Sequence, residues 1–134
     1  ILDSRPFDEY QNMSIPGGID TPGAELVHRV GGMVTDPNTL VVVNCAGRTR
    51  SIIGCQSLVN AGLENPVVAL KNGTMGWHLA GFELDHGATQ VAGQVPKPAL
   101  DWAKRAAARV AQRFGVQKID KKIQISRYYV GFSF

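Results

Sequence analysis

Three features are scarce in this chain of 134 residues, and each scarcity excludes a class of protein. The chain has only two cysteines, Cys45 and Cys55, which lie too close together for the spaced framework of a secreted disulfide-rich protein. No stretch approaches the roughly 18 consecutive apolar residues of a membrane span, and no signal peptide is visible. The three histidines, His28, His78 and His86, show no ligand spacing with cysteines or acids. We therefore expect a globular, cytoplasmic protein that needs no metal or cofactor and binds no membrane.

The basic charge of the chain is concentrated towards its C-terminus. Residues 1–94 carry 5 basic and 9 acidic side chains, whereas residues 95–134 carry 9 basic and 2 acidic ones. The change falls in a stretch rich in glycine and proline, which is typical of a linker. We therefore divide the chain into a domain over residues 1–90, a linker over 91–98 and a basic helical extension over 99–134. Aromatic side chains do not alternate with the basic ones in that helix, so a solvated face is favoured over a nucleic-acid site.

Apolar runs and turn residues predict that strands alternate with helices. Short apolar runs indicate strands, and apolar residues three and four positions apart indicate helices. The predicted strands cover residues 1–3, 39–44 and 66–70. The predicted helices cover residues 7–12, 23–30, 51–60, 75–80 and 98–114, with Gly31 and Gly32 ending the second. Their short connections predict an α/β fold, a parallel sheet flanked by helices and followed by a C-terminal helix.

Two of these elements carry an expectation about packing. The strand over residues 39–44 is apolar at nearly every position, as in a parallel strand that is covered on both faces. The helix over residues 98–114 has one apolar stripe that should face the rest of the protein. The stripe consists of Leu100, Ala103, Ala107, Val110 and Phe114.

The most informative segment reads Val-Val-Val-Asn-Cys-Ala-Gly-Arg-Thr-Arg over residues 41–50. It places Cys45 at the carboxyl end of a predicted strand, where parallel sheets bind their ligands, and just before a helix. Backbone N–H groups at such a position converge on an anion and favour a thiolate over a thiol. We therefore interpret Cys45 as a nucleophile. Cys55 lies on the apolar face of the following helix and is interpreted as a small buried hydrophobic residue rather than a resolving thiol.

Four segments, in this order along the chain, have the residue types of one known family. They are Leu2–Arg5, Glu9-Tyr10 with Ile15–Ile19, the loop Cys45–Arg50, and Asn72–Trp77 with Ala80–Phe82. Over about residues 1–87 the chain thus resembles the rhodanese (sulfurtransferase) family. The chain departs from the family pattern at three positions outside the Cys45–Arg50 loop. Ser14 stands where histidine is common, Gly18 where alanine is usual and Glu83 where proline is frequent.

The resemblance to the rhodanese family also leads to expectations about the two ends of the chain. Family members normally have a strand and a helix before the Leu-Asp-x-Arg segment, and both are missing here because the chain begins with Ile1. We therefore expect a piece of a longer protein with adjacent modules, in which the tail around residues 116–123 starts the next module. Alternatively, tail elements supply the missing sheet edge, by folding back or by exchange in a homodimer.

The resemblance implies a sulfurtransferase. Such an enzyme moves a sulfane sulfur from thiosulfate or a similar anionic donor to cyanide or a thiol, through a persulfide on Cys45. The residues implied in donor binding are Ala46, Gly47, Arg48, Thr49, Arg50 and Ser51. Arg48 and Arg50 would bind the leaving sulfite group, and a salt bridge to a nearby acid is the alternative role of an arginine here. Gly47 would adopt torsions that a side chain forbids, and Thr49 would add a hydroxyl donor.

Three charged residues near the N-terminus are implied as structural support for the site. Asp3 would brace the strand end, and Arg5 would pair with Glu9 or with a neighbouring acid. For Asp3 and Arg5 this structural role is favoured over a catalytic one.

Two other functions stay open for the same cysteine. Phosphatases, some of a related fold, place five residues between cysteine and arginine, whereas four separate Cys45 from Arg50, which favours sulfur transfer. A persulfide carrier or sensor without turnover, or a regulatory binding module, is the other alternative. A small-molecule donor and a thiol or cyanide acceptor are the expected partners.

Overall fold

The computed structural model describes residues 1–117, and the expectations for the tail beyond them lie outside the described part of the chain. Within residues 1–117, parallel pairing joins four short strands into one sheet in the order β2-β1-β3-β4. The strands are β1 (Leu2–Asp3), β2 (Ile19–Asp20), β3 (Val41–Asn44) and β4 (Val67–Ala69). The register places Asp3 of β1 opposite Asn44 of β3, so polar residues meet at the carboxyl edge of the sheet.

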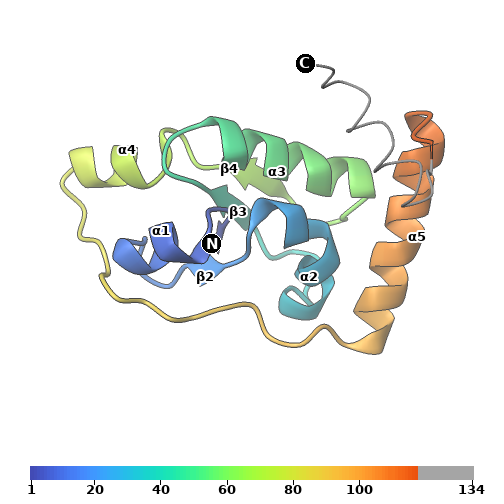
Figure 1. Ribbon diagram of the computed structural model, residues 1–134, viewed down its shortest axis with the longest axis horizontal. Helices are drawn as coiled ribbons and strands as arrows, with labels where there is room; N and C mark the ends of the chain where they lie inside the picture. Colours follow the sequence, from blue (N-terminus) through green and yellow to red (C-terminus); the bar gives the residue numbers. More distant parts are fainter. Residues whose placement is uncertain (118–134) are drawn as a thin grey trace, which may run out of the picture.

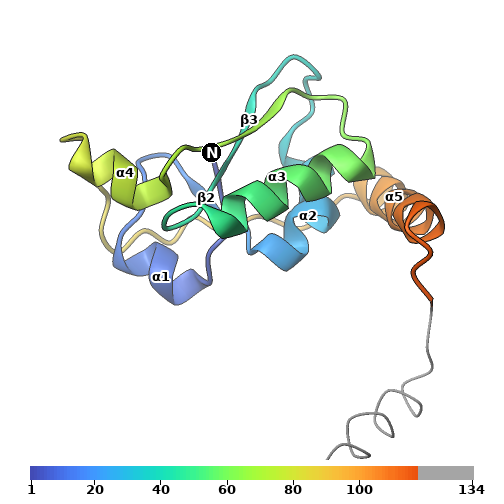
Figure 2. The ribbon, with the colours of Figure 1, turned by 90° about the horizontal axis from the view of Figure 1, so that it is seen from above.

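The helices confirm the predicted α/β architecture. They are α1 (Phe7–Asn12), α2 (Leu26–Met33) after a short 3-10 turn (Gly23–Glu25), α3 (Thr49–Ala61), α4 (Gly73–Leu79) and α5 (Lys97–Arg113). Figures 1 and 2 show α4 at one end of the molecule and α5 at the other, with α2 and α3 beside the sheet between them. The carboxyl end of β3 leads into α3 through the short loop that begins at Cys45, as expected for a site at the strand ends.

The core lies between the sheet and the helices α2 and α3. Its buried side chains are Leu2, Leu26, Val30, Val41, Val43 and Leu58. The expectation that β3 is covered on both faces is wrong for the described residues, because Val42 is only half-buried. On the neighbouring strand β4, Val68 is 43% exposed. Apolar side chains on alternate positions therefore face two different environments.

The predicted end of α2 was also wrong, because the helix continues through Gly31 and Gly32 to Met33. A Cβ at Gly31 would lie 3.2 Å from the Cβ of Ala99 in α5. The glycines therefore allow two helices to approach closely instead of terminating one.

Helix α5 packs through smaller side chains than predicted. Its buried residues are Ala99, Ala103 and Ala106, whereas Ala107 and Phe114 of the predicted stripe are exposed. At the close contact with Gly31 of α2, the nearest residue of α5 is Ala99, and Trp102 packs half-buried against the core beside it. Arg109 then reaches the end of α3, where it donates to the carbonyl oxygen of Ala61 at 3.0 Å.

The segment between α4 and α5 runs along the edge of the sheet, as Figure 1 shows. The N–H of Asp20 in β2 donates to Gln90 at 2.9 Å, and the N–H of Ala92 donates back to Asp20 at 3.1 Å. Asp85 and Ser14 form an antiparallel bridge, in which each N–H donates to the carbonyl oxygen of the other residue, at 2.8 and 2.9 Å. Within the described residues, no helix is both long and apolar enough to cross a membrane.

Candidate active site

Cys45 is buried at the carboxyl end of β3, with 2% of its surface exposed. The loop after it leads into the first turn of α3 at Thr49, whose backbone N–H groups have no partner inside the helix. The start of α4 closes the loop from the other side. There the N–H of Thr74 donates to the carbonyl oxygen of Cys45 at 2.9 Å, and that of Met75 donates to Ala46 at 3.0 Å. Two helix N-termini therefore position the cysteine.

The pKa of the Cys45 thiol is lowered by its surroundings. Burial by itself raises the pKa, but hydrogen bonds from the Ser51 side chain and from the backbone N–H groups of Ser51 and Gly47 outweigh it, with help from the charge of Arg50. The Cys45 sulfur lies 3.4 Å from the Ser51 hydroxyl oxygen. The thiolate, which is the nucleophilic form, is therefore more accessible here than in an unperturbed cysteine.

Cys55 has the opposite environment. It packs against the core from α3, and burial raises the pKa of its thiol. Both cysteines are free thiols. The pKa values of the two thiols are therefore shifted in opposite directions, downwards for Cys45 and upwards for Cys55.

The close approach between the loop and α4 depends on Gly73. Its φ is +56°, and a Cβ there would lie 2.1 Å from the carbonyl oxygen of Cys45. The expectation for Gly47 was wrong, because its φ lies outside the left-handed region and a Cβ there would meet no atom within 4 Å. Gly73, which has a positive φ and lies against the backbone of the loop, is the residue where a side chain is excluded.

A buried polar network stabilises the carboxyl ends of β1 and β3. Asp3 and Arg5 form a two-point ion pair with both N–O distances at 2.9 Å, and neither side chain is more than 3% exposed. The Asn44 amide donates to Asp3 and to the hydroxyl oxygen of Thr74, each at 2.9 Å. Arg5 also donates to the carbonyl oxygen of Met13 at 2.7 Å. The network joins β1, β3, α4 and the end of α1 through Asn44 and Thr74, which adjoin Cys45 in sequence and by a backbone hydrogen bond.

Arg50 is held by Glu9 of α1. Both terminal nitrogens of Arg50 donate to the two Glu9 oxygens at 2.7 Å, in a half-exposed pair. The hydrogen bond from Arg50 lowers the pKa of Glu9, and the same bond raises that of Arg50. Of the two partners expected for Arg5, the structure shows the neighbouring acid, Asp3, and not Glu9. Arg50 instead forms the salt bridge to Glu9, the alternative role expected for an arginine of the loop.

The remaining residues of the Cys45–Arg50 loop are more exposed than Cys45 itself. Ala46 is half-buried, and Arg48 and Thr49 are exposed. Arg48 makes no ion pair with any residue of 1–117, and its carbonyl oxygen accepts the Ser51 hydroxyl at 3.0 Å. The same part of the chain contains no group of three or more metal-ligating side chains.

This arrangement can now be compared with known proteins. A model of the rhodanese-like domain matches residues 1–80. The chain belongs to the rhodanese-like domain family.

Solved structures and a curated relative agree with membership in the rhodanese-like family. The chain is similar to the crystal structure of thiosulfate sulfurtransferase from Pseudomonas aeruginosa, with 55% identity and a TM-score of 0.88 over 97% of the chain. It is similar to a Rhodanese_3 like domain from Anabaena sp., with 26% identity, a TM-score of 0.57, and coverage of 66% of this chain and 93% of that one. An HTH-type transcriptional regulator of Mycobacterium tuberculosis is 33% identical over 88 residues, 66% of this chain. The chain spans 25% of the Pseudomonas structure and 38% of the regulator.

Sequence reasoning missed two polar residues of this rhodanese-like site, Asn44 and Thr74. Both are buried, and they bond to each other. A signal for Asn44 was present, because a polar residue directly after three valines and before Cys45 needs a buried partner. Thr74 carries no such signal, since only the packing of α4 on the loop brings it to the site.

Proposed function

We propose that this chain is a sulfurtransferase that takes a sulfane sulfur from thiosulfate or a similar anionic donor onto Cys45. The observation that carries the proposal is the lowered pKa of a buried cysteine enclosed by backbone N–H groups, with four residues between it and Arg50. The similarity to a structure described as thiosulfate sulfurtransferase supports the choice of donor. The reaction requires a reduced thiol, which is consistent with a reducing compartment such as the cytoplasm.

In the first step the Cys45 thiolate attacks the outer sulfur of thiosulfate. A new S–S bond forms to Cys45, the S–S bond of thiosulfate breaks, and its electron pair leaves with sulfite. The persulfide anion gains the same N–H groups that favour the thiolate, at Gly47 and Ser51. Arg50 can neutralise the departing sulfite when its guanidinium turns from Glu9 towards the loop.

In the second step an acceptor removes the outer sulfur. Cyanide attacks that sulfur, the S–S bond breaks, and its electron pair returns to Cys45 as thiolate while thiocyanate leaves. A thiol acceptor reacts in the same way and leaves as a persulfide. No net oxidation occurs at Cys45 over the cycle.

Steady-state turnover with thiosulfate and cyanide tests this proposal. The wild-type chain should release sulfite and thiocyanate in equal amounts, Cys45→Ala should release neither, and the matched variant Cys55→Ala should keep its turnover. Equal turnover by Cys45→Ala would overturn the proposal, and turnover of an aryl phosphate in place of thiosulfate would favour the phosphatase alternative.

A persulfide sensor without turnover is the second candidate. It is favoured by the similarity to a protein described as a transcriptional regulator. A sensor would load one sulfur on Cys45 and release it to cyanide no faster than a free persulfide does. Multiple rapid turnovers would exclude this role for the chain.

A further inference from the structure

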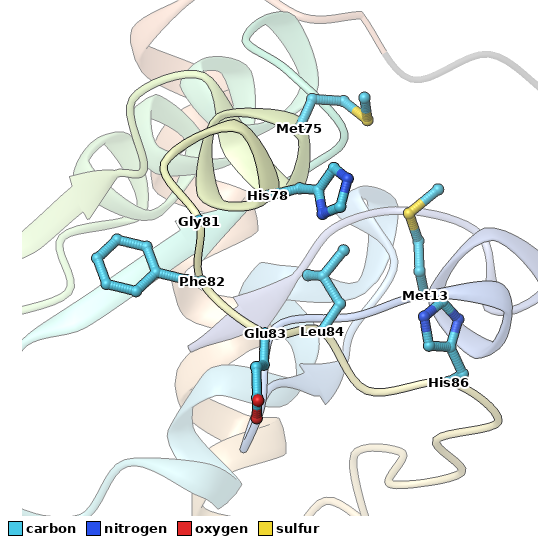
Figure 3. A pocket seen from close by; sticks show the side chains of 8 residues that line it. All are labelled: Met13, Met75, His78, Gly81, Phe82, Glu83, Leu84 and His86. Atoms are coloured by element: carbon cyan, nitrogen blue, oxygen red, sulfur yellow. The ribbon is translucent and has the colours of Figure 1, made fainter.

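A cavity of about 580 Å³ opens between the end of α1 and helix α4 (Figure 3). Its walls come from Met13 at the end of α1, Met75 and His78 of α4, and the segment from Gly81 to His86. A volume of this size suits a small organic molecule. Nothing in the two-step reaction described above uses it, because thiosulfate and cyanide are small and polar.

The lining of the cavity is apolar in its middle. Figure 3 shows the Leu84 side chain between His78 and Met13, with Met75 on the same side as His78. The Glu83 carboxylate points away from this space. Unbranched methionine side chains adapt to the shape of a flexible apolar ligand.

Polar groups at the rim are imidazoles. Nδ1 of His86 lies 2.7 Å from the carbonyl oxygen of Asn12, which requires a proton on Nδ1 and leaves Nε2 free for a ligand. His78 lies in the last turn of α4 and faces the cavity across from Leu84. The cavity thus combines an apolar middle with hydrogen-bonding groups at its edge.

The walls are held in place by contacts of their own. Trp77 of α4 donates from its indole nitrogen to the carbonyl oxygen of Glu83 at 2.8 Å, and its ring packs against Phe82 with centroids 4.8 Å apart. The paired backbones of Ser14 and Asp85 tie the next part of the segment to the end of α1. The cavity is therefore formed before any ligand arrives.

Both helices that border the cavity also contact the loop of Cys45. The Met75 N–H is bonded to Ala46, the residue next to the cysteine. From the other side, Glu9 of α1 holds Arg50 at the end of the loop. Because Met75 also lines the cavity, one wall of the cavity is joined by a hydrogen bond to the residue next to Cys45.

We propose that this cavity binds the body of a thiol acceptor with an unbranched hydrocarbon chain and a hydrogen-bonding head group. This inference rests on the proposed sulfurtransferase function and names the class of its second substrate. The chain would lie on Met13, Met75 and Leu84, and the head group would bond to the imidazoles. The acceptor thiolate attacks the outer sulfur of the Cys45 persulfide, a new S–S bond forms, and the electron pair of the broken bond returns to Cys45.

The test compares two thiols that differ in chain length. The persulfide-loaded protein is mixed with 6-mercaptohexan-1-ol or with 2-mercaptoethanol, and the rates are compared at equal thiolate concentration. Each methylene removed from water is worth about fourfold, so partial burial of the longer chain should make its rate at least tenfold higher. The measured quantity is the ratio of the two rates, which cancels any general loss of activity.

Two variants show whether the cavity causes that ratio. Leu84→Gln places a polar group in the apolar middle and should reduce the ratio to less than about threefold. Leu79→Gln is the matched control, because Leu79 is also an apolar residue near the cavity but is 81% exposed and does not line it. A ratio near one in the wild type, or equal ratios in the two variants, would overturn the inference.

Binding without reaction separates this inference from the proposed function. The chain has three methionines, so their methyl groups give three NMR signals. Hexan-1-ol should shift the signals of Met13 and Met75, and leave that of Met33, which packs on the core, unchanged. These shifts without thiosulfate turnover would contradict the proposed function alone. Turnover with no shift and no dependence on chain length would contradict the inference alone.

Discussion

At the scale of single residues, the ionisation of Cys45 depends on short contacts within its own loop. Its burial opposes a thiolate, and the Ser51 hydroxyl together with two N–H groups reverses that effect. In the present structure the Ser51 hydroxyl donates to Arg48, so ionisation of Cys45 provides a second acceptor for the same hydrogen. The pKa of Cys45 therefore depends on the hydroxyl oxygen of Ser51.

Removing that oxygen should raise the pKa of Cys45. In Ser51→Ala the thiolate loses a hydrogen bond, so its fraction at a given pH falls and the pH profile of alkylation by iodoacetamide moves to higher pH. At neutral pH we expect alkylation several-fold slower than in the wild type, with the rates converging at high pH. Ser57→Ala is the control, since Ser57 lies on the same helix and its hydroxyl donates to the carbonyl oxygen of Ile53 rather than to the loop. Identical profiles for the two variants would contradict this account.

The ion pair between Glu9 and Arg50 should control the affinity for the donor. Thiosulfate and Glu9 compete for one guanidinium, so Glu9→Gln should lower the KM for thiosulfate several-fold with little change in kcat. Asp8→Asn, a neighbouring exposed acid on α1, should leave KM unchanged. If Glu9 serves only to orient Arg50, the KM of Glu9→Gln will rise instead.

At the scale of elements, the sequence predicted the order of the long helices and of the apolar strands. It could not predict β2, because a strand of two residues has no periodicity and exists only through pairing with β1. The predicted end of α2 at Gly31 and Gly32 was wrong because the sequence does not distinguish a glycine that ends a helix from one that lets a neighbouring helix approach. The bonds from Asn44 to Asp3 and Thr74, and the pair of Glu9 with Arg50, join residues 30 to 41 positions apart and depend on register and packing.

The junction between the loop and α4 should tolerate no side chain at Gly73. Gly73→Ala places a Cβ against the carbonyl oxygen of Cys45, so we expect turnover to fall at least tenfold and the melting temperature to drop. Gly87→Ala is a matched control, because Gly87 also has a positive φ, +75°, but no atom lies within 4 Å of its Cβ position. That variant should lose only about 1 kcal/mol of stability and keep its turnover. Equal loss of turnover in both variants would contradict the packing argument.

At the scale of the whole molecule, the segment after α4 pairs with the sheet at Asp20, a buried acid whose ionised form is disfavoured. Asp20 of β2 is 5% exposed, its Oδ1 has no hydrogen-bond partner within residues 1–117, and its backbone bonds to residues 90 and 92. Burial, together with the nearby charge of Asp3, raises its pKa to about 6. The folded protein therefore holds this proton more tightly than the unfolded chain does.

The contribution of Asp20 to the stability of the fold should consequently decrease as the pH rises from about 4 to about 6. Between these values the unfolded chain has lost the Asp20 proton while the folded chain keeps it, so deprotonation favours unfolding. Asp20→Asn should remove this penalty and be more stable than the wild type by about 1–3 kcal/mol at pH 8, with no gain at pH 4. Denaturant unfolding at both pH values measures this, with Asp8→Asn as control. A gain that is equal at pH 4 and pH 8 would contradict the assignment.

The central claim is that Cys45 accepts a sulfur atom directly from thiosulfate. Mixing the reduced chain with thiosulfate in the absence of an acceptor, followed by mass spectrometry of the peptides and a sulfite assay, tests it most directly. The account predicts one added sulfur on the peptide that contains Cys45, none on Cys55, and one sulfite released per sulfur bound. An unmodified Cys45 with no sulfite released would contradict it.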